Sequence, residues 1–570
     1  MKMNWELRQT DQNTVARLTQ ELGLSPLIAR ILNNRFIFSR EEAERFLNPS
    51  FKDLPPPSLL KDIDKATERI VSAIENKERI LIFGDYDVDG ITATSLLYRF
   101  LCNASAHVSF YIPNRITEGY GLKPSHIKSC ALNKNINLII TVDCGSSSHA
   151  AILEAQHHNI DVIVTDHHEP PENLPEALAM INPKRKDASR GLNDLAGVGV
   201  AFYLIINLRM QLRENGFWRG QQEPNLKMLC DLVALGTVAD VVPMVNENRI
   251  LTRAGLEVLQ TKGNTGVRIL MDQCRIDKHH MDSMDIAFKL APRLNAAGRV
   301  AHADAAMALL EAENTGDAAQ HAEHLHVLNQ KRRDMEKVIL EEIDDYLVQH
   351  PFKAHSKIAL LHSRGWHVGI LGIVASRLVN QYALPFVVLT LDGEIAKGSA
   401  RSIPGIDLAL LFSKCSRHLI SHGGHAMAAG LQLHVDNIEA FRDALEKNVE
   451  DMGASGMTPL SLKVDATLGF KEITRALVDE LELLKPFGEK NPEPLFVSEN
   501  VHVRSSKILS GGHRRMALNQ ADGHCFQAIH FSPARDAASL DFFKKIAYRL
   551  QLNRWNGREN IQLVIEDIIA

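Results

Sequence analysis

Short apolar runs alternate with amphipathic stretches from residue 79 onward. The apolar runs are aliphatic and few residues long, and helix-like stretches such as 147–158 lie between them. This rhythm is typical of a parallel sheet whose strands are joined by helices. The predicted strands are 80–83, 107–112, 137–142 and 161–165. We therefore expect an α/β domain whose ligand site lies beyond the carboxyl ends of the strands.

The rest of the chain shows three other patterns. The N-terminal stretch is mainly helical and polar, and we expect it to pack on the first α/β domain as an extension. Residues 311–350 mix charged and apolar positions without proline, which predicts a long helical connector. Strand-like runs at 358–361 and 386–389 predict a second, smaller α/β domain. The predicted domains are 1–78, 79–305, 306–350, 351–455 and 456–570.

The C-terminal stretch consists of short strands and tight turns. Turn signals stand at Gly511-Gly512 and Asn556-Gly557. About five strands with interspersed aromatic and basic residues favour an oligonucleotide-binding β-barrel, the OB-fold. Trp555, beside Arg554 and Arg558, is the candidate for base stacking. The predicted strands are 495–497, 501–504, 526–531, 546–552 and 561–565.

Charge changes this picture at the C-terminal end. The chain has 570 residues and a net charge of −5, yet residues 501–560 hold ten Lys/Arg and four Asp/Glu, which leaves −11 for the remainder. A basic module on an acidic body indicates a polyanion partner, and an accidental surface imbalance is the alternative. Seven scattered cysteines without a Cys-x-x-Cys pair argue against structural zinc. With no signal-peptide or membrane-spanning pattern, we expect a cytoplasmic protein that does not associate with a membrane.

Acidic and imidazole residues follow the predicted strands. If the sheet is parallel, these strand ends lie on one rim. Asp240, which follows the helical run 226–235, could reach the same rim. The first three carboxylates, at alternate positions, repel one another unless a cation neutralises them. The candidates are Asp85, Asp87, Asp89, Asp143, Asp166, His167, His168 and Asp240.

This set of oxygens with one or two imidazoles and no thiolate suits Mn²⁺ or Mg²⁺ better than zinc. There are enough carboxylates for two ions, and an aspartate shared by two ions about 3.5–4 Å apart is the arrangement for in-line attack on a phosphodiester. A calcium loop is disfavoured, since Leu96 stands where such a loop needs a glutamate. A solvated acidic turn without a ligand, or a set of helix N-caps, would also place aspartates at these positions.

Basic and glycine-rich segments supply candidates for phosphate contact. Arg293 and Arg299 flank a small-residue turn predicted at 291–299, although Arg293 could instead be a structural ion-pair partner. The glycines of 365–372 and 421–426 let a backbone approach a phosphate closely, or make ordinary turns. The candidates for nucleic-acid contact are Arg115, Arg293, Arg299, Arg401, His425 and Trp555.

Four ordered motifs resemble those of the DHH phosphoesterase superfamily. They are Gly84–Gly90, Val142–Gly145, Asp166–His168 and Gly236–Asp240. Residues 421–430 resemble the glycine-rich motif of its DHH-associated domain. With the barrel added, the chain from about residue 79 onward resembles the RecJ family of single-strand-specific exonucleases.

The resemblance implies 5′→3′ digestion of single-stranded DNA to mononucleotides in recombination and repair, with two Mn²⁺ or Mg²⁺ ions. Asp143 would bridge the ions, and Asp85 would be a ligand or support one. His168 would face the scissile phosphate, Asp166 would orient an imidazole, and Arg299 and Arg115 would contact phosphates near the 5′ end. A single-strand-binding protein and a helicase would be partners. The implied ligands are Asp87, Asp89, Asp143, His167 and Asp240.

Two further hypotheses stay open on the sequence. One is a related phosphodiesterase of short oligonucleotides or cyclic dinucleotides, which would not need a basic C-terminal barrel. The second is a non-catalytic DNA-binding replication scaffold, which would have lost metal ligands, whereas this chain keeps the full set.

Overall fold

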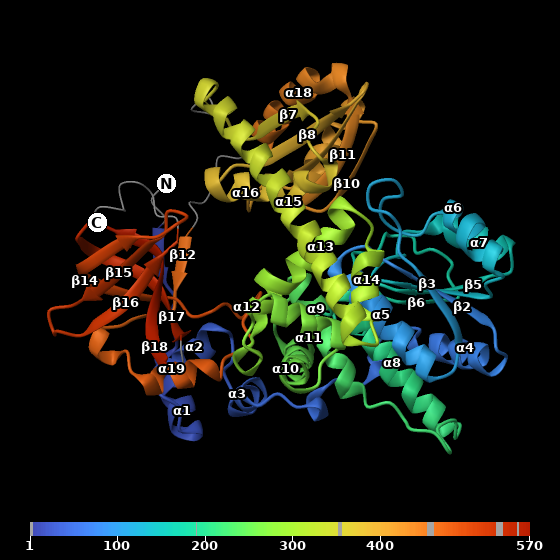
Figure 1. Cartoon of the computed structure of the whole chain (residues 1–570), viewed down its shortest axis with the longest axis horizontal. Helices are drawn as coiled ribbons and strands as arrows, with labels where there is room; N and C mark the ends of the chain where they lie inside the picture. Colours follow the sequence, from blue (N-terminus) through green and yellow to red (C-terminus); the bar gives the residue numbers. More distant parts are fainter. Residues whose placement is uncertain (1–3, 190, 352–355, 453–460, 532–539, 556–557) are drawn as a thin grey trace.

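Three bodies surround one long helix in this computed structural model. It describes residues 4–189, 191–351, 356–452, 461–531, 540–555 and 558–570. Helix α15 (Thr315–Gln349) runs from the first α/β domain to the second one (Figure 1). The barrel lies at the left of this view. Within these residues, no helix has both the length and the apolar character that a membrane span requires.

A five-stranded parallel sheet forms the first domain, in the order β3-β2-β4-β5-β6. The four predicted strands are confirmed to within two residues, and only the short β6 escaped prediction. Because the pairings are all parallel, the carboxyl ends of β2, β4 and β5 lie at one edge. The strands are β2 (Arg79–Gly84), β3 (His107–Tyr111), β4 (Leu138–Val142), β5 (Asp161–Thr165) and β6 (Ala179–Ile181).

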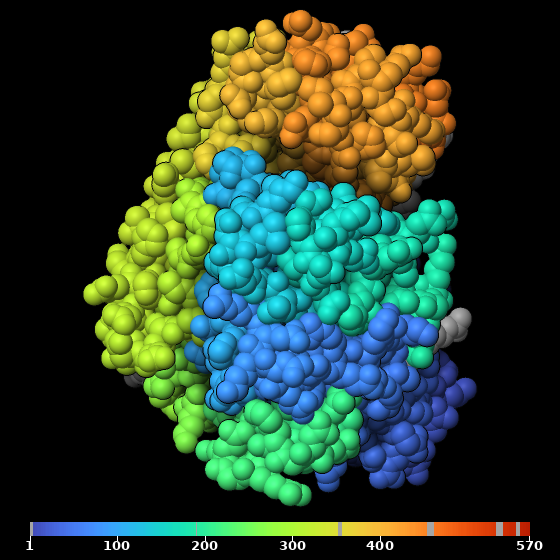
Figure 2. Space-filling model, turned by 90° about the vertical axis from the view of Figure 1, so that its right-hand side faces the viewer, coloured from blue at the N-terminus to red at the C-terminus, as the bar shows by residue number. Residues whose placement is uncertain are grey.

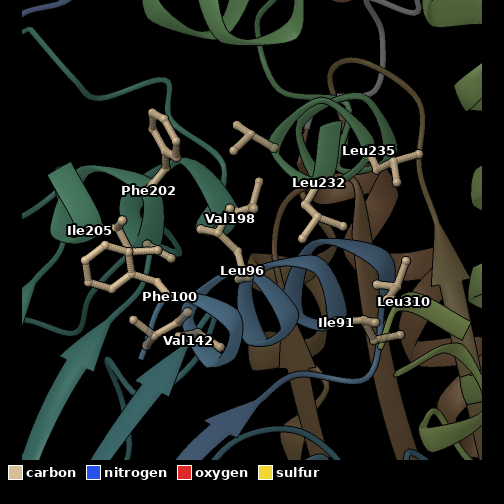
Figure 3. Close-up of a cluster of buried hydrophobic side chains, with 14 of the residues drawn as sticks. Ile91, Leu96, Phe100, Val142, Val198, Phe202, Ile205, Leu232, Leu235 and Leu310 are labelled. Carbon is tan, nitrogen blue, oxygen red and sulfur yellow. The ribbon is translucent and has the colours of Figure 1, made fainter. Parts of the chain in front are cut away.

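Helices α5 (Val88–Asn103), α8 (Gly197–Glu214) and α9 (Cys230–Ala239) pack together against this sheet. Leu96, Phe100, Val198, Phe202 and Leu232 meet in their shared core (Figure 3). Helix α5 is buried on nearly every side. The turn that joins β2 to its N-terminus, which carries aspartates of the first motif, is therefore held in a fixed position. The other helices of this domain are α6 (Pro124–His126), α7 (His149–His157), α10 (Asn246–Thr261), α11 (Thr265–Gln273), α12 (Ser283–Asp285), α13 (Ala291–Val300) and α14 (Asp304–Leu310).

The predicted turn at 291–299 is wrong, because these residues form α13.

The second α/β domain has the mixed sheet β10-β11-β9-β8-β7, in which only β7 and β8 are parallel. Its strands are β7 (Ala359–Arg364), β8 (Phe386–Asp392), β9 (Ile395–Arg401), β10 (Ser421–Gly424) and β11 (Ala428–His434). Its helices are α16 (Leu371–Tyr382), α17 (Leu408–Lys414) and α18 (Ile438–Asp451).

The C-terminal domain is a closed five-stranded barrel, since β14 pairs with both β15 and β17. The turn at Gly511-Gly512 is confirmed, and both glycines have positive φ. The turn at Asn556-Gly557 lies outside the described residues. The predicted strands 495–497 and 501–504 form one strand, and β15 was missed. The elements are β12 (Ser461–Val464), β13 (Ala466–Thr467), α19 (Arg475–Glu482), β14 (Phe496–Ile508), β15 (Arg514–Asn519), β16 (Cys525–His530), β17 (Phe542–Trp555) and β18 (Arg558–Ile569).

The N-terminal helices pack mainly on the barrel, so the expected packing of the whole extension on the first domain is wrong. Leu18 and Leu32 are buried in one cluster with Phe496 and Tyr548 of the barrel. Only α4 joins the core of the parallel sheet. The elements are β1 (Asn4–Leu7), which pairs with β12, α1 (Gln12–Leu22), α2 (Pro26–Asn34), α3 (Arg40–Leu47) and α4 (Ile63–Glu75).

Candidate active site at the rim of the parallel sheet

The acidic and imidazole side chains predicted at the strand ends meet at one rim. His167 Nε2 lies 3.1 Å from Asp143 Oδ1 and 3.5 Å from Asp240 Oδ2. The same nitrogen lies 3.7 Å from Asp89 Oδ2. Three overlapping groups have ligand atoms within 4.8 Å of one another: Asp143, His167 and His168; Asp89, His167 and Asp240; and Asp85, Asp87 and Asp143.

Two helix N-termini hold the first motif in place. Asp87 caps α5 and accepts hydrogen bonds from the backbone N–H groups of Asp89 and Gly90. The carboxylate of Asp89 accepts from Gly197 N at 2.6 Å and Val198 N at 2.9 Å, at the start of α8. Free N–H groups at a helix start favour an anion there. A Cβ on Gly197 would lie 2.6 Å from Asp143 Oδ1, so only glycine allows this approach.

Asp143 is placed by an unusual backbone conformation. Its φ of 60° lies in the left-handed region, which aspartate tolerates better than most residues, and its side chain is buried. The hydroxyl of Tyr120 donates to the Asp143 carbonyl at 3.1 Å and lies 3.1 Å from His168 Nδ1. Sequence analysis missed Tyr120. Its flanking residues Gly119 and Gly121, both at positive φ, are the signal that could have marked a tight turn projecting it into the site.

Asp166 and His168 form a charged pair beside the candidate ligands. Asp166 accepts hydrogen bonds from the backbone N–H groups of Ser146, His167 and His168, and one from His168 Nδ1 at 2.8 Å. Burial alone would raise the pKa of Asp166, but the His168 hydrogen bond and charge lower it to about 2. Burial likewise opposes protonation of His168, yet Asp166 raises its pKa to about 9. His168 is therefore an oriented cation at neutral pH.

The remaining charges of the rim are crowded and largely uncompensated by the chain. Burial and then the charge of Asp87 raise the pKa of Asp89 to about 7. Burial and then the charge of Asp89 raise the pKa of Asp240 to about 8, and burial followed by neighbouring carboxylates raises that of Asp143. Burial lowers the pKa of His167 to about 3, so its imidazole is neutral and can offer a lone pair.

Buried atoms without partners show that this chemistry fits metal ions. Asp85 Oδ1, Asp143 Oδ1 and both ring nitrogens of His167 accept or donate no hydrogen bond within the described residues. The short contacts of His167 Nε2 lack hydrogen-bond geometry. Leaving such a group unpaired costs about 1–3 kcal/mol. Carboxylate oxygens with one or two imidazoles are donors that Mn²⁺ and Mg²⁺ accept.

Three arginines from separate segments lie near the rim and near one another. Arg115 covers the ring of Tyr86 at 4.8 Å, Arg299 of α13 donates to the carbonyl of Gly369 at 3.3 Å, and Arg401 of β9 donates to Ser399 Oγ at 3.1 Å. Burial and then the charge of Arg115 lower the pKa of Arg299 to about 9, and both causes lower that of Arg401. Within the described part of the chain, none of the three arginines forms an ion pair.

The other candidates for nucleic-acid contact stay predictions. Arg293 donates to the carbonyl of Lys289, in the helical turn just before α13, at 2.7 Å. His425 is exposed beside β10, and no described contact joins it or Arg293 to the rim. The side chain of Trp555 lies outside the described part. Figure 2 shows the second α/β domain (orange) stacked against the first one (blue to cyan).

Comparisons with known proteins agree with this architecture. The chain matches family models described as the DHH family N-terminal domain over 79–237, the DHHA1 domain over 354–451 and the RecJ OB domain over 464–567. It is 34% identical over 587 residues to the single-stranded-DNA-specific exonuclease RecJ of Escherichia coli, and the match covers 100% of both chains. The chain belongs to the RecJ family.

Other RecJ proteins are similar to it at comparable levels. The RecJ of Bacillus subtilis is 34% identical over 573 residues, which cover 99% of this chain and 71% of that protein. The crystal structure of RecJ in complex with Mn²⁺ from Thermus thermophilus superposes with a TM-score of 0.83 at 28% identity, covering 100% of this chain and 79% of that one. A structure of the same protein in complex with Mg²⁺ gives a TM-score of 0.78 at 26% identity, over 100% and 78% of the two chains.

Proposed function

We propose that this chain is a single-stranded-DNA-specific 5′→3′ exonuclease that releases mononucleotides by metal-dependent phosphodiester hydrolysis in DNA recombination and repair. One observation carries the proposal: carboxylates and imidazoles from four chain segments converge at one rim, with buried ligand atoms that lack partners among the described residues. Its relatives in the RecJ family are single-stranded-DNA-specific exonucleases.

Two ions, Mn²⁺ or Mg²⁺, would be held by the rim, with Asp143 shared between them and Asp85 as a further donor. When bound, the ions supply an activated water and stabilise charge on the phosphate oxygens. His168, kept protonated by Asp166, offers a fixed positive charge to a phosphate. Tyr120 and Asp166 hold that imidazole in place from two directions. The proposed ligands are Asp87, Asp89, Asp143, His167 and Asp240.

Three arginines near the rim are the proposed site for the terminal 5′-phosphate. Arg115, Arg299 and Arg401 form a cationic group without carboxylate partners in the described part of the chain, and guanidinium groups bind phosphate through paired hydrogen bonds. A terminal 5′-phosphate held there places the first phosphodiester bond near the rim. Each cycle then removes one nucleotide from the 5′ end, and the product is a mononucleotide.

The competing functions fit the molecule less well. A phosphodiesterase of dinucleotides has no need for a strand-binding barrel, yet residues 464–567 match the RecJ OB domain. Arg504, Lys507, Arg515 and Lys544 are exposed on this barrel, so it offers a cationic surface to a strand. A non-catalytic scaffold has no use for a ligand set of which Asp89, Asp143 and His167 are buried.

Finer assignments belong to the same proposal. We place the protein in the cytoplasm and expect a single-strand-binding protein and a helicase as partners, since single strands arise where these proteins work. The division into 79–305, 306–350, 351–455 and 456–570 is proposed as the functional one, with α1–α3 counted with the barrel.

A strand labelled at one end tests the proposal. With Mn²⁺, a 5′-labelled single strand should release its label at once as a mononucleotide, whereas a 3′-labelled strand should shorten progressively. The blunt duplex of the same sequence should persist. Release of the 3′ label first, or equal digestion of the duplex, contradicts the proposal.

A further inference from the structure

The barrel is docked on the catalytic domain by residues 483–491, which follow α19 and are called the docking segment. Met244 N donates to the carbonyl of Glu489 at 2.7 Å, and Ser283 Oγ donates to the carbonyl of Phe487 at 2.7 Å. Lys485 pairs with Asp282 at 3.1 Å. Met244 lies four residues after the candidate ligand Asp240, so the docking segment contacts the catalytic domain close in sequence to the rim.

Arg249 of α10 is the centre of this contact. Its side chain is 1% exposed. Nη1 donates to the carbonyls of Leu484 at 2.9 Å and Pro486 at 3.2 Å, and Nη2 donates to Leu483 at 3.3 Å. Nε donates to the carbonyl of Phe46 at 2.8 Å, and the guanidinium covers the Phe46 ring at 3.8 Å. Helices α3 and α10 lie between the barrel and the parallel sheet (Figure 1).

Among the described residues, the acceptors of Arg249 are backbone carbonyls rather than a carboxylate. Burial and then the charges of Arg253 and Arg35 lower its pKa to about 9, so the cation is kept at neutral pH. Carbonyls of a folded segment cannot rotate to follow the donor. A planar guanidinium with several fixed donors therefore fixes the orientation of the segment, which a lysine ammonium at the same place cannot do.

The contact continues into the body of the barrel. Asn491 Nδ2 donates to the carbonyls of Leu484 at 3.0 Å and Pro486 at 2.8 Å, two of the acceptors used by Arg249. Asn491 Oδ1 accepts from Arg35 Nε at 2.7 Å, at the end of α2. The hydrogen bonds thus run from α10 through the docking segment to the helices that pack in the barrel core.

We infer that Arg249 is a positioning residue, which fixes the barrel relative to the metal rim so that a strand bound on the barrel reaches the rim along a path of fixed length. This inference rests on the proposed function. A strand that spans both sites gains from their fixed separation, because the second contact is made at a high effective concentration. A dinucleotide touches the rim alone and gains nothing.

The test compares two substrates in the full chain with Mn²⁺: a 60-nucleotide single strand and a 5′-phosphorylated dinucleotide. Arg249→Lys should raise KM for the long strand about tenfold with kcat nearly unchanged, and should leave kcat/KM for the dinucleotide within about twofold. Small-angle scattering should show a larger maximum dimension. Arg268→Lys, the same change at an exposed arginine of α11 away from the docking segment, should change neither readout.

Three results overturn the inference. The first is an unchanged KM for the long strand. The second is an equal loss on both substrates, which indicates a structural role at the rim. The third is the same change in Arg268→Lys. If Arg249→Lys fails to fold, Ser283→Ala is the deciding variant, because it removes one contact from the other side of the docking segment. It should raise the KM for the long strand about two- to threefold. An unchanged KM contradicts the inference. If the unmodified chain digests neither substrate, the proposed function itself fails.

Discussion

The rim of the parallel sheet and the barrel domain are assembled in opposite ways. At the rim, Asp87 caps the helix that directly follows its own strand, and Asp166 accepts from the backbone N–H groups of His167 and His168 just after β5. In the barrel, the core joins residues at the two ends of the chain, since Leu18 and Leu32 pack with Phe496. These two rim side chains are placed by the local backbone, although Asp89 is also held by the distant Gly197 and Val198, whereas the barrel core joins the two ends of the chain.

This difference separates chemistry from stability. Removing a proposed ligand from the rim should abolish activity while the hydrophobic core of the domain stays complete. Removing an apolar residue from an N-terminal helix opens the core of a domain more than 400 residues away in sequence. Each prediction below tests one side of this contrast, from the largest expected effect to the smallest.

Replacing the shared ligand should give the largest effect. Asp143→Asn keeps the shape of the side chain but removes the charge common to both ion positions, so release of mononucleotides should fall about a thousandfold or more. The thermal unfolding midpoint should not fall, because a crowded buried charge is lost. Asp272→Asn, an exposed carboxylate on α11, is the control and should keep full activity. Near-normal turnover by Asp143→Asn would remove the rim from the mechanism.

Truncating a core residue of an N-terminal helix should destabilise the barrel and spare the rim. Leu32 is fully buried, so Leu32→Ala should lower the free energy of unfolding of the barrel domain by about 2–5 kcal/mol. Urea unfolding monitored by fluorescence, with dinucleotide hydrolysis measured in parallel, distinguishes unfolding of the barrel from loss of activity at the rim. Leu7→Ala, at a 51% exposed leucine of β1, should cost little. Simultaneous loss of hydrolysis at the lower urea concentration would show that the regions do not unfold independently.

Removing an arginine near the rim should affect recognition of the 5′ end. Arg299→Ala should lower kcat/KM about 10- to 100-fold on a 5′-phosphorylated strand, the worth of hydrogen bonds to a charged group, and much less on a 5′-hydroxyl strand. Arg293→Ala, six residues earlier on the same helix, is the matched comparison, because Arg293 donates to the carbonyl of Lys289 just before that helix. Equal losses on both kinds of strand, or a larger effect from Arg293→Ala, would exclude Arg299 from the phosphate site.

Glu247 at the junction of the two regions should make stability depend on pH. Burial and then the charge of Asp194 raise its pKa from 4.5 to about 7. The folded state therefore holds this proton more tightly than the unfolded state, and stability contributed by Glu247 falls as the pH rises from about 4.5 through 7. Glu247→Gln should stabilise the protein by about 1–3 kcal/mol at pH 8 and by less at pH 5. Urea unfolding at both pH values measures this, and an equal gain at both would contradict it.

The rim was predictable from the sequence because its signals are local. Strands 80–83 and 161–165 could be recognised by their apolar runs, and a parallel sheet brings their ends together wherever the chain goes in between. Tyr120 was missed because a tyrosine between two glycines resembles any surface turn. Arg249 could not be found, because backbone carbonyls leave no mark in the sequence. The packing of α1–α3 on the barrel was predicted wrongly, since an amphipathic helix shows that it has a partner but not which one.

The central claim is that the rim binds a pair of cations, and Mn²⁺ binding measures this most directly. Titration calorimetry combined with electron paramagnetic resonance on the unmodified chain should give two Mn²⁺ ions per chain with a spin-coupled signal. Asp143→Asn should lose the coupling and at least one ion. A chain that binds no Mn²⁺, or an Asp143→Asn variant that keeps two coupled ions, would contradict the account.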